Sequence, residues 1–449
     1  MSNVSPQRWA VIGNGLVGQT LAHRLAQAGQ TVTLFASPGE LGALTAVEPL
    51  DSLSHDPYPW IIRSEDVWLR ERLRELDLES DLRWFTAQTG LLARRQLYPV
   101  SMGAGLLKLA LLRPVGRIRL ALTLAGLRCG GPTKLGNVEW LRHWSGRRIF
   151  RQIWQPLLRS QLGDSYYKVA VPYLWAAVLG PSLRQTPTQF GYLQGGYGHL
   201  AAAHRVWLQS AGVSLCDRAV GQIWRDPAIQ QIRVKRLPPT ASGADCHDPT
   251  CARIQSFDQV VVTTGTPTAV NLCRGLTQRE QRQLSQVPYL GLVCLSLLLN
   301  RSLSPCTITH IAGAAPFDRV VEGPDRRGIG YPVYLLRYVR PTDRIFALPD
   351  AVLADEYLTA LARLHPRFEP SQVLRWRLVR TQHAIALPTP SALAQPPPIH
   401  TTIPGLHLLS SAHAPTGILS LDHSLQLAET HLAPLLTAAA TQAPSTTAV

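Results

Sequence analysis

Three glycines near the start of the sequence have the spacing of a phosphate-binding turn. Gly13, Gly15 and Gly18 form the pattern G-x-G-x-x-G. In such a turn the first glycine permits a tight bend, the second lets a pyrophosphate approach the backbone, and the third lets a helix pack closely on a strand. The helix that follows presents free N–H groups and the positive end of its dipole to the phosphates. These residues, with Leu16 beside them, predict a dinucleotide-binding crevice.

The residues around the glycines predict the strand–helix–strand unit that this turn requires. Residues 9–12 are an apolar run typical of a buried parallel strand, and residues 31–35 are a second, β-branched run. Between them, apolar residues recur at helical spacing, and Gly29 stands where that helix should end. The alternative is a doubly wound domain of the same fold whose crevice is empty.

One residue departs from the dinucleotide-binding pattern. The second strand normally ends in an acid that accepts hydrogen bonds from the adenosine ribose, but this sequence has Ala36, and the next residue, Ser37, is a weaker acceptor. Losing one charge-assisted hydrogen bond costs ~1.5–3 kcal/mol, or roughly tenfold to a hundredfold in affinity. A ligand that makes many other contacts can still bind, so Ala36 alone does not exclude the cofactor.

Length, composition and charge place limits on the function. The 449 residues are 45% hydrophobic and include 11 tryptophans, as expected for a folded protein of two or three domains. The net charge of +15 favours an anionic surface, either a membrane or an acidic protein partner. The sequence has no zinc spacing, helix-turn-helix signal or RNA-binding aromatic motif, so we expect no nucleic-acid partner.

Other segments indicate the compartment and argue against a metal. No signal peptide precedes the first strand, and the longest apolar run, residues 287–299, is too short to span a membrane, so we expect a cytoplasmic protein. The seven cysteines are scattered and do not resemble a disulfide framework. Cys246, His247 and Cys251 lie in a segment rich in proline, glycine and serine, which we interpret as a solvent loop with no metal.

Three separate segments of the sequence have the pattern of a nucleotide-binding fold. We assign residues 1–50, 191–275 and 401–436 to a Rossmann-like α/β domain, on the basis of strand runs that alternate with glycine turns and helices. Residues 51–190, which we expect to be mainly helical, and residues 276–400 would form an inserted α+β substrate domain. Residues 437–449 are rich in alanine and threonine, and we expect them to be a disordered tail.

Several motifs together carry a resemblance to a known family. They extend over nearly the whole chain: the glycine triplet, residues 139–163 (EWLRHWSGRRIFRQIWQPLLRSQLG), residues 191–200 (GYLQGGYGHL), residues 260–265 (VVVTTG) and residues 403–412 (IPGLHLLSSA). The sequence resembles the FAD-dependent amine oxidase superfamily, on the branch with phytoene desaturases and protoporphyrinogen oxidase. Within that branch it is most similar to bacterial proteins described as NAD(P)/FAD-dependent oxidoreductases.

The resemblance implies where FAD would bind. Gly13, Gly15 and Gly18 would face the pyrophosphate, and the backbone of Val220 would meet adenine. Gly265 would end the strand beneath the cofactor, and a helix beginning near Leu421 would point its N-terminus at the flavin. Several positions depart from the family pattern at this ligand: Ala36 replaces the acid, Gly42-Ala43 replaces a paired glycine, and Ser410-Ser411 replaces Gly-Asp. The other residues that we expect to reach the cofactor are Ser37, Gly42, Ser411 and Asp422.

The resemblance also implies a reaction, with alternatives that the residues leave open. The leading hypothesis is an FAD-dependent oxidoreductase of the oxidase or desaturase type, which transfers hydride from a hydrophobic substrate to flavin; no catalytic residue is assignable. The departures at the cofactor favour a second hypothesis, a catalytically degenerate relative that acts as a binding or scaffold subunit. A plain NAD(P) reductase is disfavoured, because a simple nicotinamide domain does not need the distant third segment.

A long basic segment permits two interpretations. Residues 82–138 contain no acid but nine lysines and arginines, and residues 105–127 alternate leucine-rich turns with single cations. This pattern is typical of an amphipathic helix at a membrane interface, whose arginines extend toward the headgroups. The alternative is a core helix pair with solvated arginines at its rim.

Several isolated residues have a structural role as their first interpretation. We expect Trp140, Trp144 and Trp154 to be core residues, and four histidines to be structural: His199, His383, His407 and His413. Arg380 could neutralise an acidic substrate, but a structural role is favoured.

Overall fold

The protein is described here by a computed structural model. The structure describes residues 6–36, 56–59, 61–100, 103–109, 111–134, 138–174, 189–237, 253–325, 328–414 and 420–442.

A five-stranded parallel sheet brings together segments that are far apart in the chain. Its order is β18-β12-β1-β2-β8, and the strands are β1 (Arg8–Ile12), β2 (Thr31–Phe35), β8 (Ser214–Cys216), β12 (Gln259–Val262) and β18 (Leu406–Leu408). All four pairings are parallel. Because the strands of such a sheet are covered on both faces, they read as continuous apolar runs.

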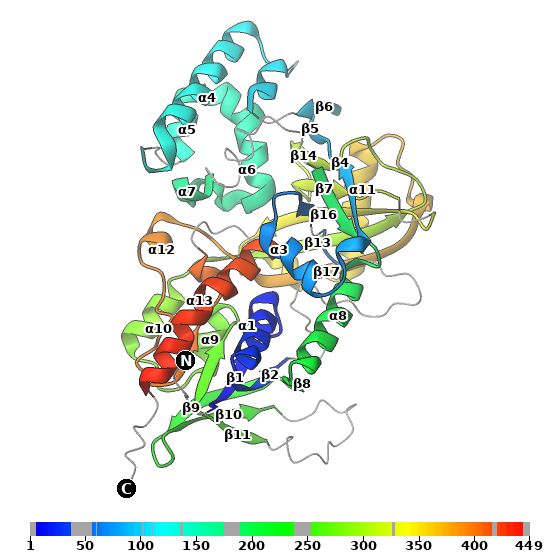
Figure 1. Ribbon diagram of the computed structural model, residues 1–449. Coiled ribbons are helices and arrows are strands. Elements are labelled where there is room, and N and C mark those ends of the chain that lie inside the picture. The colour runs from blue at the N-terminus through cyan, green and yellow to red at the C-terminus, as the bar shows by residue number, and fades with distance from the viewer. Residues whose placement is uncertain are drawn as a thin grey trace.

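Alternate residues of β1 enter two different cores. Trp9 and Val11 face helices on one side of the sheet, while Ala10 and Ile12 face the other side. The first side is covered by α1 (Leu16–Gln27), α8 (Gly196–Ser210) and α13 (Leu421–Gln442), and Figure 1 shows α1 between the other two. The second side is covered by a three-stranded antiparallel sheet of β9 (Val220–Asp226), β10 (Gln231–Arg236) and β11 (Ile254–Phe257), with α9 (Thr266–Leu272) and α10 (Gln278–Ser285).

A seven-stranded mixed sheet forms the centre of the second half of the molecule. Its order is β17-β13-β16-β15-β14-β5-β6, and its strands are β5 (Thr89–Ala93), β6 (Gln96–Val100), β13 (Tyr289–Leu299), β14 (Ile308–Ala312), β15 (Arg319–Glu322), β16 (Tyr331–Val339) and β17 (Val373–Ala386). The long strand β13 is buried at every residue, because both of its faces are covered.

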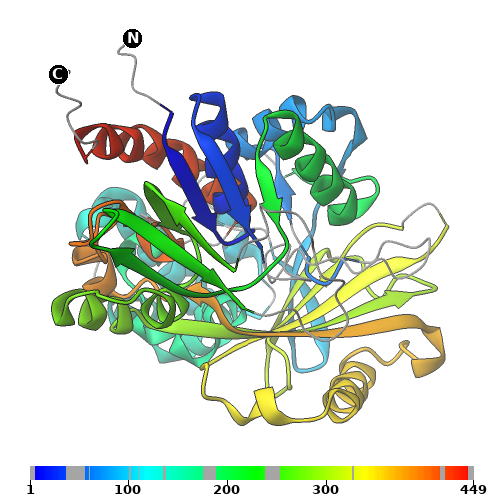
Figure 2. The ribbon, with the colours of Figure 1, turned by 90° about the horizontal axis from the view of Figure 1, so that it is seen from below.

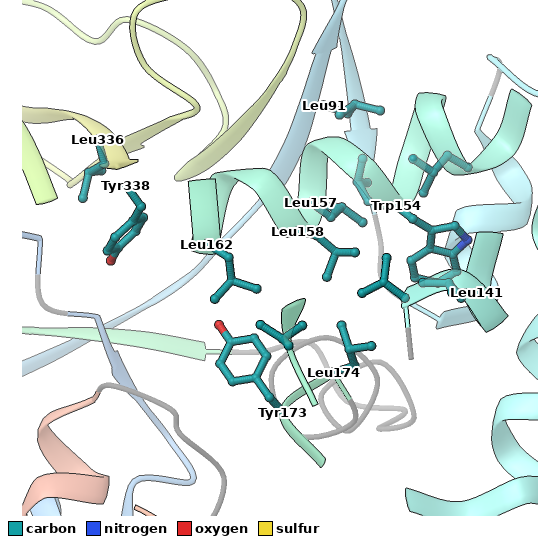
Figure 3. Packing of buried hydrophobic residues seen from close by; sticks show 14 of the residues in the cluster. Leu91, Leu141, Trp154, Leu157, Leu158, Leu162, Tyr173, Leu174, Leu336 and Tyr338 are labelled. Carbon is teal, nitrogen blue, oxygen red and sulfur yellow. The ribbon is translucent and has the colours of Figure 1, made fainter. Parts of the chain in front are cut away.

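Helices cover the two faces of this mixed sheet. One face packs against α4 (Pro114–Lys134), α5 (Val138–Ile149), α6 (Gln155–Leu162) and α7 (Val171–Leu174). In this core Leu157, Leu158 and Leu162 of α6 lie near Tyr173 and Tyr338 (Figure 3). The other face packs against α11 (Asp350–Leu364), which lies below the long strands in Figure 2.

A small third sheet lies near α8. It has the order β3-β7-β4 and consists of β3 (Ile62–Arg63), β4 (Leu82–Thr86) and β7 (Gln189–Leu193). Two further helices complete the fold: α3 (Val67–Glu75), which packs on α13, and α12 (Pro390–Ala394).

The observed fold confirms the predicted α/β class with a Rossmann-like parallel sheet, and it corrects three details. The first inserted segment is mainly helical between residues 103 and 174, but it also contributes β3 to β6, which the sequence did not lead us to expect. Helix α13 continues to Gln442, so the expected disordered tail does not begin at residue 437. Trp144 is 51% exposed and is not a core residue, whereas Trp154 is fully buried. The domain boundaries stay a prediction.

Candidate functional site

The carboxyl ends of the parallel strands meet at one edge of the five-stranded sheet. The N–H of Gly13 donates to the Phe35 carbonyl (3.0 Å), and the N–H of Thr263 donates to the Ile12 carbonyl (2.8 Å). On the next strand, the N–H of Leu409 donates to the Val262 carbonyl (2.9 Å). The residues that follow β1, β12 and β18 are therefore neighbours, and this edge is where open α/β sheets bind ligands.

The three glycines of the turn occupy three different environments. Gly13 has a φ of +117°, which favours glycine, and a Cβ there would lie 2.6 Å from Thr263 Oγ1. A Cβ on Gly18 would lie 2.0 Å from the Gly13 carbonyl oxygen, so only glycine lets α1 pack this closely. Around Gly15 a Cβ would meet nothing within 4 Å. The turn is thus closed beneath the helix and open where a pyrophosphate would approach.

The N-terminus of α1 is suited to an anion. Leu16 begins the helix after Gly15, and within the described residues no side chain caps this end and no acid lies in its first turn. The free N–H groups and the helix dipole therefore attract negative charge here. Asn14 also lies at this turn, where its carbonyl and side-chain oxygens both accept from Gln19 Nε2 at 3.1 Å.

A cavity lies on the β2 side of the turn. It is bordered by Asn14, by the buried residue Ala36, and by one face of α8 that carries Ala201 and Ala202. Val220 begins β9 a few residues after the end of β8, which is the strand next to β2. The predicted contacts at Ser37 and Gly42 lie outside the described residues.

The opposite, β12 side holds the other predicted cofactor residues. Gly265 precedes the first residue of α9, three residues after β12, and Ser411 begins a short helical turn after β18. Asp422 lies in the first turn of α13, but its Oδ1 accepts from the Leu69 N–H (2.9 Å) and so caps α3. Since this contact occupies one carboxylate oxygen, the role of Asp422 toward flavin stays a prediction.

An aromatic pocket lies between the small sheet and the mixed sheet. Phe85 and Phe190 border it on one side, and Tyr334 borders it on the other. Asp56 also lines it, and its Oδ1 accepts from the Tyr197 N–H (2.8 Å) at the start of α8. The motif around residues 191–200 was recognised in the sequence, but Asp56 was missed, because nothing local links it to a helix 140 residues later.

A buried polar cluster adjoins this pocket and was also missed. The hydroxyls of Tyr58 and Tyr338 lie 3.0 Å apart, and the guanidinium carbon of Arg319 lies 6.0 Å from the centre of the Tyr338 ring. Burial raises the pKa of the Tyr58 hydroxyl well above its ordinary value, so this group stays protonated and can donate. The sequence does not reveal this cluster, because Tyr58 is far in the sequence from Arg319 on β15 and Tyr338 on β16.

Other predicted residues are structural. Arg380 binds Asp350 and donates to the backbone carbonyls of Ile345, Phe346 and Leu348, so it is not available to a substrate. His407 is buried between Gln259 and His400. Residues 238–252, with the Cys246, His247 and Cys251 motif, lie outside the described residues. In the part of the chain that the structure describes, no group of three or more His, Cys, Asp or Glu could hold a metal.

The residues present fit a dinucleotide such as FAD. A pyrophosphate would lie on Gly15 and the N-terminus of α1, because these backbone groups are open and uncapped among the described residues. The adenosine would extend over the end of β2, where dinucleotide-binding folds hold the ribose.

Comparisons with known proteins agree with this geometry. The family model for flavin containing amine oxidoreductases matches residues 18–418. No curated protein matches. Among solved structures, a putative protoporphyrinogen oxidase from Exiguobacterium sp. 255-15 has 18% identity and a TM-score of 0.73, covering 97% of this chain and 100% of its own.

Two further solved structures have the same fold. A cyclohexylamine oxidase from Brevibacterium oxydans IH-35A has 14% identity and a TM-score of 0.70, covering 96% of this chain and 99% of its own. A reduced UDP-galactopyranose mutase has 14% identity and a TM-score of 0.72, covering 98% of this chain and 96% of its own. At these identities the structures show only a shared fold, whereas the family model covers most of the sequence. The chain belongs to the flavin-containing amine oxidoreductase family.

Proposed function

We propose that this protein is an FAD-dependent oxidoreductase that oxidises or desaturates a hydrophobic substrate. The observation that carries the proposal is the aromatic pocket lined by Tyr58, Phe85, Phe190 and Tyr334, which lies beside the N-terminus of α8. Pockets with mainly apolar walls and few polar groups are typical of small-molecule sites. Since the same fold also occurs in a mutase, family membership alone does not fix the reaction.

The chain's own residues would perform binding and orientation. The Gly13–Gly18 turn and α1 would bind the pyrophosphate, and the aromatic walls would hold the substrate and exclude water. Bound FAD supplies the hydride acceptor, and the protein supplies geometry and polarity. The hydroxyl of Tyr58 lies 3.0 Å from that of Tyr338, and this contact would hold the Tyr58 ring in place where it lines the pocket.

The absorption spectrum of the purified protein tests the proposal first. We expect a bound flavin spectrum, either at once or after FAD is added, and loss of the flavin absorbance when an oxidisable apolar substrate is mixed in without oxygen. A panel of hydrophobic amines and polyenes would identify the substrate class. Colourless protein that does not take up added FAD would contradict the proposal and favour the degenerate binding subunit, for which Ala36 is the supporting observation.

A second proposal concerns attachment to an anionic membrane. Val115, Ile118 and Leu122 of α4 are 78%, 64% and 62% exposed, and their spacing places them on one face of the helix. Arg113 and Arg117 flank them and are also exposed. Leu120 of α4 is buried in the core that α4 shares with α5 and α7, so α4 has both a buried face and an exposed apolar face. Among the described helices, none is long and apolar enough to cross a membrane.

Sedimentation with vesicles tests this second proposal. We expect the protein to pellet with vesicles rich in phosphatidylserine at low salt, and Ile118→Glu to abolish this. Val206→Glu is the matched control, because Val206 is 66% exposed on α8 and lies away from α4. Equal pelleting of both variants, or no pelleting of the unchanged protein, would refute membrane attachment; an acidic protein partner would then be the remaining explanation for the basic surface.

A further inference from the structure

The strand register brings an acid to the level of Ala36. Strands β2 and β8 are parallel, with Phe35 opposite Cys216, and the N–H of Ala36 donates to the Cys216 carbonyl at 2.9 Å. The next residue after Cys216 is Asp217. Asp217 therefore stands one strand outward from Ala36 and at the same height on the sheet, a lateral step of about 4.8 Å.

Ala36 and Asp217 border the same cavity. Asn14 borders it at the glycine turn, and on the opposite wall Gly198, Ala201 and Ala202 present small side chains from α8. Small residues at spacings of three and four on one helix face keep that wall flat and leave room for a ligand. The cavity thus connects the turn that suits a pyrophosphate with the carboxylate of Asp217.

The strand order indicates which half of a dinucleotide would enter this cavity. β1 lies between β12 and β2 in the sheet. With the pyrophosphate over the end of β1, one half of the dinucleotide would extend toward β2 and the other half toward β12. In dinucleotide-binding folds the adenosine ribose lies at the end of the second strand, where an acid accepts from its hydroxyls. The cavity lies at that end of β2, but in this chain the acid at that position is missing.

We propose that Asp217 accepts the hydrogen bonds of the adenosine ribose hydroxyls in place of the missing acid at position 36. The inference rests on the proposed binding of FAD. Arg205 of α8 holds the carboxylate, with Nη2 at 3.2 Å from Asp217 Oδ2. A carboxylate has about four acceptor sites, so Asp217 can bind Arg205 and the ribose together.

The Asp217 carboxylate contributes little to folding, which makes it a clean target for substitution. The Arg205 and Asp217 side chains are 53% and 59% exposed. Exposed ion pairs of this kind contribute only about 0–1 kcal/mol. We therefore expect Asp217→Asn to fold normally, so that any change in affinity reports on the ligand.

A binding titration that does not depend on turnover tests the inference. Full-length protein freed of flavin is titrated with FAD, and separately with ADP and 2′,3′-dideoxy-ADP. We expect Asp217→Asn to weaken FAD binding by about tenfold to a hundredfold. Asp355→Asn, which changes an exposed acid on the distant α11, should bind as the unchanged protein does. The unchanged protein should prefer ADP to the dideoxy analogue, and Asp217→Asn should lose that preference.

A rescue variant adds a second readout. Ala36→Glu in the Asp217→Asn background places a carboxylate at the end of β2, and we expect it to restore FAD affinity and the preference for ADP. If the unchanged protein binds FAD while Asp217→Asn binds it equally well and keeps the preference for ADP, the assignment of Asp217 is wrong and the proposed function stands. If the unchanged protein takes up no FAD, the assignment of Asp217 and the proposed function are both wrong.

Discussion

At the residue scale, two glycines of the turn have different roles. Gly18 is needed for the close packing of α1, whereas Gly15 leaves space for a ligand. A Cβ at position 18 would overlap the Gly13 carbonyl oxygen, whereas a Cβ at position 15 meets nothing within 4 Å. We expect Gly18→Ala to lower the free energy of unfolding by about 1–3 kcal/mol, as overpacking does. Gly15→Ala should leave the free energy of unfolding nearly unchanged and weaken FAD binding, because the methyl group stands where the pyrophosphate approaches.

Denaturant unfolding and flavin titration of both variants check this contrast. If Gly15→Ala destabilised the fold as strongly as Gly18→Ala, the open environment at position 15 would be disproved. If Gly15→Ala left FAD binding unchanged, the pyrophosphate would not lie on this turn.

A buried histidine gives the fold a dependence on pH. Burial, and then the charge of Arg72, lower the pKa of His204 to about 3. The unfolded chain has a histidine pKa near 6.5, so between pH 6.5 and 3 it binds a proton that the folded chain does not, and stability falls as the pH falls. For His204 alone the loss between pH 6.5 and 5 is about 2 kcal/mol.

Replacing this histidine should remove its share of the acid sensitivity. Neither ring nitrogen of His204 has a hydrogen-bond partner among the described residues, so His204→Phe should cost little at pH 7.5. Urea unfolding at pH 7.5 and pH 5 should show a smaller drop for this variant than for the unchanged protein or for His199→Phe, which alters an exposed residue. A drop of undiminished size would mean that His204 is not buried in its neutral form.

At the element scale, the start of α3 depends on a residue of α13. Asp422 caps the Leu69 N–H, and Asp66 accepts from the Arg63 N–H just before the helix. Burial raises the pKa of Asp66 to about 6, and the Asp422 charge adds to this. We expect Asp422→Ala to lower the free energy of unfolding by about 1–2 kcal/mol, as the loss of a helix cap does. Asp422→Asn keeps an acceptor oxygen and should lose less; equal losses in denaturant unfolding would show that the cap is unimportant.

At the scale of the whole molecule, one carboxylate joins three separate segments of the chain. Glu429 of α13 lies 2.8 Å from Arg24 Nε of α1 and 3.3 Å from Arg72 Nη2 of α3, and Arg72 lies over the ring of Trp207 in α8. The Arg72 side chain is 2% exposed, and burial lowers its pKa to about 10. Glu75 of α3 pairs with the same two guanidinium groups, at 3.0 Å from Arg72 Nε, so Arg24 and Arg72 share two carboxylates.

Neutralising this carboxylate should destabilise the fold. Among the described residues, Glu429→Gln leaves Glu75 as the single carboxylate paired with Arg24 and Arg72, and we expect a loss of about 1.5–3 kcal/mol in the free energy of unfolding. Glu71→Gln is the control, since Glu71 is 59% exposed in its pair with Arg74 and should cost less than about 1 kcal/mol. If both variants lost the same free energy of unfolding in denaturant, the contacts of Glu429 would not stabilise the fold more than an exposed ion pair does.

The sequence was enough to predict the elements whose signals lie within a few neighbouring residues. The strand, turn and helix around Gly13 follow from short apolar runs and glycine spacing, and the three distant segments of the parallel sheet carry the same local signals. The sequence did not predict the position of Asp217 beside Ala36, because that depends on the register between β2 and β8. Strands β3 to β6 escaped notice because they are short, and because most residues of β4 and β6 are exposed or half-buried. Asp56 and Arg319 became candidates only when distant strands were brought together.

The order of the parallel strands along the chain has a consequence for folding during translation. Strand β18 follows its neighbour β12 by more than 140 residues, and the whole mixed-sheet strand series from β13 to β17 lies between them. A nascent chain that has left the ribosome as far as residue 400 therefore exposes β12 as an open edge, with its backbone groups ready to pair with another chain. The nucleotide crevice closes only after the seven-stranded sheet has had time to form. The β12 edge is therefore the place where this fold is most open to pairing with another chain before synthesis is complete.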